Sequence, residues 1–212
     1  MIIYALSTDA RQAASHLCNQ HLSETLHNGA NIMLAVCKIW GISDDNMPRI
    51  DPRGMRWTYP SEQDMAEIIE QPWTKWAAES WANFQWLSRY LRQANREFRS
   101  RYEQVSHASY TYMDALCDTM RGQVFLHQSQ DDYEFMKSAE PEHQPFPRTF
   151  GDFEVADDRP TVKAYRDYYK QMPPSNTAGA WHVGNTPYWY NHMAPVEHIR
   201  NNQHGWSMEE LE

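Results

Sequence analysis

Five arginines crowd into one short segment of an acidic chain, and their side chains are suited to holding phosphate. The segment LSRYLRQANREFRSRY, residues 87–102, contains one acid and five basic residues: Arg89, Arg92, Arg96, Arg99 and Arg101. Five positive charges less one negative charge give +4 here, whereas the whole chain has a formal net charge of -9. A guanidinium group presents five N–H donors in a planar fork that fits phosphate oxygens.

Four of these arginines recur at helical spacing and so fall on one predicted helix face: Arg89, Arg92, Arg96 and Arg99. We predict that this face binds DNA phosphates or a diphosphate. The alternative is a solvated face whose charges pair with nearby acids such as Glu79, Glu97 and Glu103. The net acidity of the chain opposes DNA binding at long range, so only local charge can support it.

Polar residues continue the apolar stripe of the same segment. The stripe has helical spacing from Phe84 to Phe98, and towards the N-terminus the same spacing meets Asn83, Ser80 and Trp76. A buried amide or hydroxyl without a partner costs about 1–3 kcal/mol. These polar side chains therefore either satisfy one another and the nearby backbone, or line the floor of a pocket.

Two histidines are candidates for acid–base chemistry because imidazole titrates near neutrality. His107 follows the predicted helix, where it is a candidate general base or a simple helix cap. His16 and His21 are five residues apart, one more than the helical spacing of a metal-binding pair. HExxH, CxxC, GxxxxGK[ST], GxGxxG and GxSxG are absent from the sequence, so nothing indicates a metallohydrolase, zinc deaminase, kinase, dehydrogenase or hydrolase, and we expect no cofactor.

Aromatic and basic residues alternate late in the chain. The stretch VKAYRDYYK, residues 162–170, is followed by AWHVGNTPYWY, residues 180–190. Aromatic rings can hold an unpaired base at about 1–3 kcal/mol per base. The alternative is the tyrosine-rich edge of a core.

Composition indicates one mainly α-helical domain spanning residues 1–212. Glycine is scarce, at eight of 212 residues, while aromatics make up 13%. We expect a helical core over 1–121, a long loop or lid over 122–160, and a helix with an aromatic-rich tail over 161–212. Three isolated cysteines and the lack of an apolar run of about 20 residues predict a soluble protein of the reducing cytoplasm, with no membrane partner.

The element pattern refines this expectation. We predict a strand over residues 2–6, a helix over 10–27 that stops at Asn28-Gly29, and a helix over 30–40. A capping box at Ser61 starts a short helix through residue 69. One long helix begins soon after Pro72, and the chain then lacks Gly and Pro until Gly122. Two more helices are expected over 110–120 and 161–171.

Three blocks of the sequence resemble a family of phage thymidine hypermodification transferases, the amino acid:DNA transferases. The first is AASHLCNQHLSETL, and the last combines PFP at 145–147, Asp158, VxAYRxYY at 162–169 and Trp181 with a downstream Pro-x-Trp. The middle block is Pro-x-x-x-Trp-x-x-x-Ser-x-x-Asn-x-x-Trp-Leu from Pro72, continuing to Glu97, Arg101 and His107. The family pattern has Asp-Lys where this chain has Asn19-Gln20, a departure that bears on substrate choice and on activity.

The resemblance implies a reaction on DNA that carries 5-hydroxymethyluracil activated as a diphosphate ester. The amine of a free amino acid displaces the diphosphate at the exocyclic methylene, without a metal. The implied catalytic residues are His107, His21 and Glu97. The implied substrate-binding residues are Trp76, Ser80, Asn83, Arg101, Tyr165, Arg166 and Trp181.

Two other functions fit the same sequence. A glycosylase or nuclease-like enzyme that acts on a modified or damaged base needs a similar pocket and similar DNA contacts. A non-enzymatic phage protein that binds a host factor through its acidic exterior needs neither.

Overall fold

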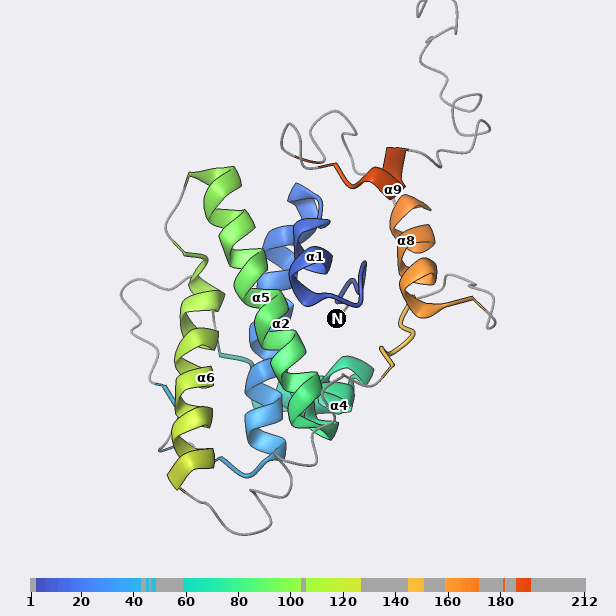
Figure 1. The fold of residues 1–212 in the computed structure, drawn as a ribbon. Coiled ribbons are helices and arrows are strands. Elements are labelled where there is room, and N and C mark those ends of the chain that lie inside the picture. Colours follow the sequence, from blue (N-terminus) through green and yellow to red (C-terminus); the bar gives the residue numbers. More distant parts are fainter. Residues whose placement is uncertain are drawn as a thin grey trace, which may run out of the picture.

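The structure, a computed structural model, describes residues 3–42, 45, 47–48, 59–103, 106–126, 145–150, 159–171, 181 and 186–191. Within these residues every regular element is a helix, so the prediction of a mainly α-helical chain is confirmed. The elements are α1 (Ala10–Ser15), α2 (Asn19–Ile39), α3 (Glu62–Glu70), α4 (Pro72–Glu79), α5 (Trp81–Tyr102), α6 (Ala108–Leu126), α8 (Thr161–Gln171) and α9 (Tyr188–Asn191). Helices α2, α5 and α6 run side by side, each opposite in direction to the one before (Figure 1).

The predicted break at Gly29 is wrong, because α2 continues through it to Ile39. The chain breaks earlier, at residues 16–18, between α1 and α2. Gly29 meets a different need: a Cβ at this position would overlap the Leu91 side chain and lie 2.9 Å from its Cγ. Glycine here allows α2 and α5 to approach closely.

The predicted N-terminal strand is also wrong for the part of it that the structure describes. Residues 3–6 are buried but pair with no other strand among the described residues. Side chains bind their carbonyl groups instead: the Tyr90 hydroxyl donates to Tyr4 O at 3.3 Å, and Arg166 Nε donates to Leu6 O at 2.8 Å. The segment is therefore held between α5 and α8 without a sheet.

The expected long helix after Pro72 is two helices. Pro72 starts α4, where its missing N–H costs nothing, and Ser80 ends that helix in an extended conformation. Ser80 then caps α5, since its Oγ accepts from Asn83 N at 3.1 Å. The capping box at Ser61 and Asp64 that starts α3 is confirmed.

The later elements keep their predicted places, but α6 is longer at both ends. Helix α6 extends beyond the predicted 110–120 and passes Gly122, so the first residues of the expected loop are helical. Residues 127–144 and 151–158, with Asp158, lie outside the described residues. Residues 145–150 are described, and Phe146 and Phe150 are buried in the core. Helix α8 matches its predicted bounds.

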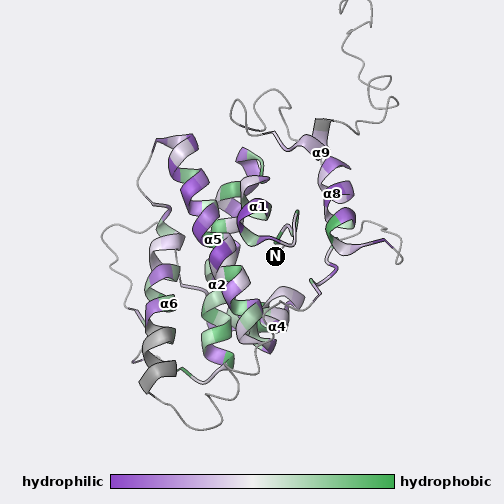
Figure 2. Cartoon of the chain, in the orientation of Figure 1, coloured by the Kyte–Doolittle hydropathy of each residue, from purple (hydrophilic) through white to green (hydrophobic). Residues whose placement is uncertain are grey.

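The core joins an aliphatic half to an aromatic half. Helix α2 contributes small and aliphatic side chains, whereas the polar residues of α5 line its outward face (Figure 2). Trp73, Trp76 and Trp86 pack with Phe146, with ring centroids 4.7–5.9 Å apart for the Phe146 pairs. Phe146 thus links the later part of the chain to the α4–α5 corner.

Gly29→Ala tests the close approach of α2 and α5. Alanine gains about 1 kcal/mol of helix propensity, but its methyl group must displace the buried Leu91 side chain at about 1–3 kcal/mol. We expect lower free energy of unfolding in urea, by about 1 kcal/mol. In a Leu91→Ala background the same substitution should be neutral or stabilising. Stabilisation of the otherwise unchanged protein by Gly29→Ala would contradict the proposed packing.

Candidate functional site

Three of the four arginines on the predicted phosphate-binding face lie free on the surface of α5. Arg89, Arg96 and Arg99 are exposed, and no acid in the described part of the chain lies within ion-pair distance of them. Arg11 of the adjacent α1 is also exposed. Arg92 differs, because it is half-buried beside Tyr110 of α6 and lowers the pKa of that phenol against the larger effect of burial. We call Arg89, Arg96 and Arg99 the arginine row.

Arg101 lies on the same helix but is buried. All five of its N–H donors are used: Nε and Nη2 donate to Glu97 Oε2 at 3.3 and 3.0 Å, Nη1 to Leu17 O and Asn19 Oδ1, and Nη2 also to Ser15 O. Its side chain is 1% exposed. Arg101 and Glu97 therefore hold the turn between α1 and α2, and these contacts do not favour a substrate-binding role for Arg101.

The polar residues on the apolar face satisfy one another. Asn83 is fully buried, and its Nδ2 donates to Trp76 O at 2.7 Å, while Ser80 caps the same helix. Trp76 packs edge-on against Trp73 and Trp86. These contacts favour the structural interpretation of these residues: they form a tight corner between α4 and α5. Their predicted role in substrate binding gains no support from this geometry.

His107 lies directly before α6 and not on the end of α5. Its Nδ1 accepts from Ser109 N at 3.3 Å, so Nε2 carries the proton and donates to Ser23 Oγ at 2.9 Å. Burial, followed by the charge of His27, lowers the pKa of His107. The imidazole is thus neutral at pH 7, but its one lone pair faces a backbone N–H. This arrangement makes His107 the weaker of the two candidate bases.

His21 belongs to a cluster of buried reactive groups that the sequence did not reveal. Its Nδ1 lies 3.4 Å from Cys18 Sγ, and the Tyr169 hydroxyl oxygen accepts from Cys18 N at 2.6 Å. Tyr4 stacks on the imidazole with ring centroids 4.7 Å apart. We call Cys18, His21 and Tyr169 the thiol cluster.

The electrostatics of the thiol cluster favour a thiolate. Burial raises the pKa of the Cys18 thiol, but hydrogen bonds from His21 and Tyr169 and the charge of His21 outweigh it, and the pKa lies below its ordinary value. Cys18 is also the N-cap of the 21-residue α2, where the partial positive charge of the helix end stabilises an anion. For Tyr169, burial and then the charge of Cys18 raise the pKa well above that of a free phenol.

The sequence contains one signal of this cluster, a cysteine followed three residues later by a histidine. Because no CxxC is present, the sequence predicts three isolated thiols. Tyr169 lies 151 residues from Cys18 along the chain, so no spacing rule links them. The helix break that makes Cys18 an N-cap was predicted at Gly29 and not here.

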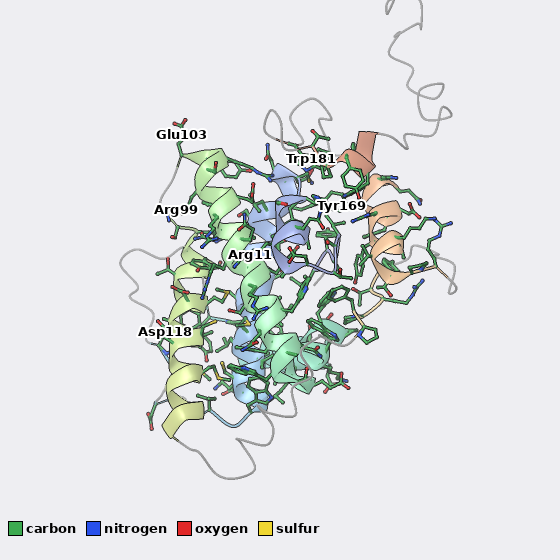
Figure 3. All side chains as sticks on the ribbon, viewed as in Figure 1. Arg11, Arg99, Glu103, Asp118, Tyr169 and Trp181 are labelled. Atoms are coloured by element: carbon green, nitrogen blue, oxygen red, sulfur yellow. The ribbon has the colours of Figure 1, made fainter. Side chains whose placement is uncertain are left out.

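Aromatic residues from the end of the described chain cover the turn between α1 and α2. Trp181 Nε1 donates to His16 O at 3.0 Å, and Trp189 Nε1 donates to His16 Nδ1 at 3.1 Å. Burial, followed by the charge of Arg166, lowers the pKa of His16 to about 4, which keeps it a neutral acceptor. Trp181 and Tyr169 lie together between α1 and α8, on the opposite side of α1 and α5 from Arg99 (Figure 3).

Two other predicted site residues are placed by α8. The guanidinium of Arg166 lies 5.3 Å from the Trp189 ring centroid, while its Nε binds Leu6 O. Tyr165 is fully buried, and its hydroxyl donates to Pro147 O at 2.7 Å. Tyr165 therefore packs inside the core, whereas Trp181 lies beside the thiol cluster. The structure brings His21 and Trp181 to one region and leaves Asn83 and Tyr165 in the interior.

One described pocket lies away from these residues. A pocket of about 950 Å³ lies between the end of α2 and α3, with Lys38, Met47, Tyr59 and Met65 in its wall, and it contains none of the predicted site residues. Across the described residues no three His, Cys, Asp or Glu side chains gather to hold a metal ion. No described helix is both long and apolar enough to cross a bilayer.

Comparison of the chain with protein-family models, with curated protein sequences and with solved structures gave no match. The chain's own residues and the resemblance of its three sequence blocks are therefore what indicate a function.

Arg101→Ala tests the role of the buried guanidinium. Removal leaves the carbonyl groups of Ser15 and Leu17 without a donor and Glu97 without its cation, so we expect the free energy of unfolding to fall by about 3 kcal/mol. Arg101→Lys should give an intermediate loss, because one ammonium cannot reach all four acceptors. Arg99→Ala, on the exposed face of the same helix, is the control and should change stability by less than about 0.5 kcal/mol. Equal effects of the two alanine substitutions would disprove the role of Arg101 in holding the turn between α1 and α2.

Proposed function

We propose that the protein modifies DNA by transferring an amino-acid amine onto activated 5-hydroxymethyluracil, with release of diphosphate. The arginine row is the observation that carries this proposal. Three exposed guanidinium groups have no acid within ion-pair distance among the described residues, although the chain as a whole is acidic. An exposed cluster of like charges repels itself, and a bound polyanion removes this repulsion.

Local charge can outweigh the global charge at contact distance. At physiological ionic strength the Debye length is about 8 Å, so distant acids are screened while guanidinium groups in contact with phosphate are not. Glu97, the one acid within the segment, is held by Arg101 and Gln93. It therefore does not neutralise the arginine row.

The proposed transfer requires a base for the incoming amine and a surface for the base being modified. In the reaction the amine nitrogen attacks the exocyclic methylene, a C–N bond forms, and the C–O bond breaks as diphosphate leaves with the electron pair. His21 is the better base of the two candidates, because its Nε2 has no hydrogen-bond partner among the described residues. Tyr169 lies edge-on to its imidazole and packs against Trp181, and we assign the stacking of the modified base to these two rings.

Binding of DNA measured against salt tests the role of the arginine row. Arg89→Gln with Arg96→Gln removes two positive charges, and the slope of log K against log salt concentration should become shallower by about two. Lys75→Glu is the matched control: it changes the net charge by the same two units on α4, where Lys75 pairs with Glu70. Fluorescence anisotropy with a labelled duplex gives both slopes. Equal losses in the two variants would mean that only net charge matters, and no salt dependence in the parent protein would favour the non-enzymatic function.

Nucleoside mass spectrometry tests the reaction itself. DNA that contains 5-hydroxymethyluracil is incubated with the protein, a hydroxymethyluracil kinase, ATP and mixed amino acids, and is then digested. We expect a nucleoside heavier than hydroxymethyldeoxyuridine by an amino acid less water. An abasic site or a free base would instead identify the glycosylase. Omission of the kinase should abolish the product, because the hydroxyl group is then a poor leaving group.

A further inference from the structure

The three cysteines of this chain are all buried but differ in their surroundings. Cys37 belongs to the hydrophobic core, and burial followed by the charge of Cys117 raises its pKa to about 12. Cys117 lies 3.5 Å from Ser88 Oγ, a neutral partner. Cys18 has an imidazole and a phenol beside it, and it is the N-cap residue of α2. A thiol packed only for its volume needs none of these groups.

The groups around Cys18 are fixed by further contacts. Tyr4 stacks on His21 at 22° between planes, and Tyr169 meets the same imidazole edge-on at 5.0 Å. The imidazole is thus held with Nδ1 toward the sulfur. The Tyr169 oxygen is fixed by Cys18 N–H, which leaves its own proton to donate to the sulfur. The arrangement is pre-organised for a negative charge on sulfur.

The site lies close beneath the surface. Cys18 is 1% exposed, but Tyr102, which is 40% exposed, binds the backbone of the adjacent residue through its hydroxyl and Asn19 O. The half-buried Tyr190 packs on Trp181 at 4.5 Å, and both tyrosines lie close enough that the charge of Cys18 contributes to a raised pKa, after burial. Aromatic rings therefore lie between the sulfur and the surface, and such rings suit a planar electrophile.

We propose that Cys18 is a nucleophilic thiolate that carries the transferred group covalently, with His21 as its acid–base partner and Tyr169 as a positioning residue. The identity of the electrophile rests on the proposed function: an activated methylene on a pyrimidine ring. The sulfur attacks this carbon, a C–S bond forms, and the C–O bond breaks as diphosphate leaves with the electron pair. The amino-acid amine then attacks the same carbon, a C–N bond forms, the C–S bond breaks to restore the thiolate, and the ammonium proton passes to His21.

Alkylation of the native protein tests the thiolate without DNA. The protein is treated with iodoacetamide from pH 5 to 9, and the occupancy of each cysteine is read by peptide mass spectrometry. At pH 7 we expect Cys18 to react at least ten times faster than Cys37 and Cys117, with a pH midpoint below the value of about 8.5 for a free thiol. His21→Gln and Tyr169→Phe should raise this midpoint and slow the reaction at pH 7 about tenfold for each unit of change in pKa.

The internal comparison keeps the test decisive if a variant does not fold. Cys37 and Cys117 report general loosening in the same sample, and the midpoint of Cys18 in the unmodified sequence needs no variant. A Cys18 rate no greater than that of Cys37, or a midpoint at or above that of a free thiol, overturns the proposal. A purely structural Cys18–His21 contact would leave the midpoint unchanged in His21→Gln.

Transfer assays separate this inference from the proposed function. With activated DNA and no amino acid, the intact mass of the protein–DNA mixture should show a thioether adduct that Cys18→Ser lacks. Unchanged product formation by Cys18→Ser would reject the covalent step while the transfer itself stands. A fast-reacting Cys18 with no modified nucleoside from the parent protein would reject the proposed transfer and leave the thiolate in place.

Discussion

The buried guanidinium of Arg101 is the contact on which the candidate site depends. It binds Ser15 O and Leu17 O, and so holds the end of α1 against the start of α2 while Glu97 balances its charge. The turn between these helices decides where α2 begins, and with it the position of Cys18 at the helix N-terminus. A charge so completely enclosed is stable only when all its donors are satisfied, which makes the geometry of the turn specific.

Segments that are distant in the sequence are joined by side chains that donate hydrogen bonds to backbone carbonyl groups. These bonds take the place of the strand pairing in a sheet. Trp86 Nε1 binds Thr8 O at 2.7 Å, Trp40 Nε1 binds Ala78 O at 2.9 Å, and Trp181 Nε1 binds His16 O. Each indole combines a large apolar surface with one polar atom, so it can fill the core and satisfy a carbonyl at its edge. Three of the nine tryptophans of the chain act in this way. The irregular N-terminal segment is buried on the same principle.

Charge on α5 is divided between two tasks by position. Arg101 points toward α1 and is enclosed, whereas the arginine row is exposed, and Arg99 lies on the opposite flank from Tyr169 and Trp181 (Figure 3). Phosphate binding and covalent chemistry would therefore use separate surfaces joined by α1 and α5. Each of these two helices is about 10–12 Å wide, a span that a long polyanion can bridge. A free nucleotide cannot engage the two surfaces as readily.

Local patterns in the sequence determined the helical class, the capping box at Ser61, the bounds of α8 and the exposed arginine spacing. These features follow from contacts within a few residues. Tertiary structure decided the rest. Position 29 lies inside a helix and is glycine because Leu91 occupies the space of a side chain, and Asn83 binds Trp76 O. Tertiary structure also brought Tyr169 to Cys18 and made Arg101 a clamp while Arg99 stayed exposed. The physical reason is that the partners which bury a side chain or shift its pKa come from distant parts of the chain, and spacing along the sequence does not record them.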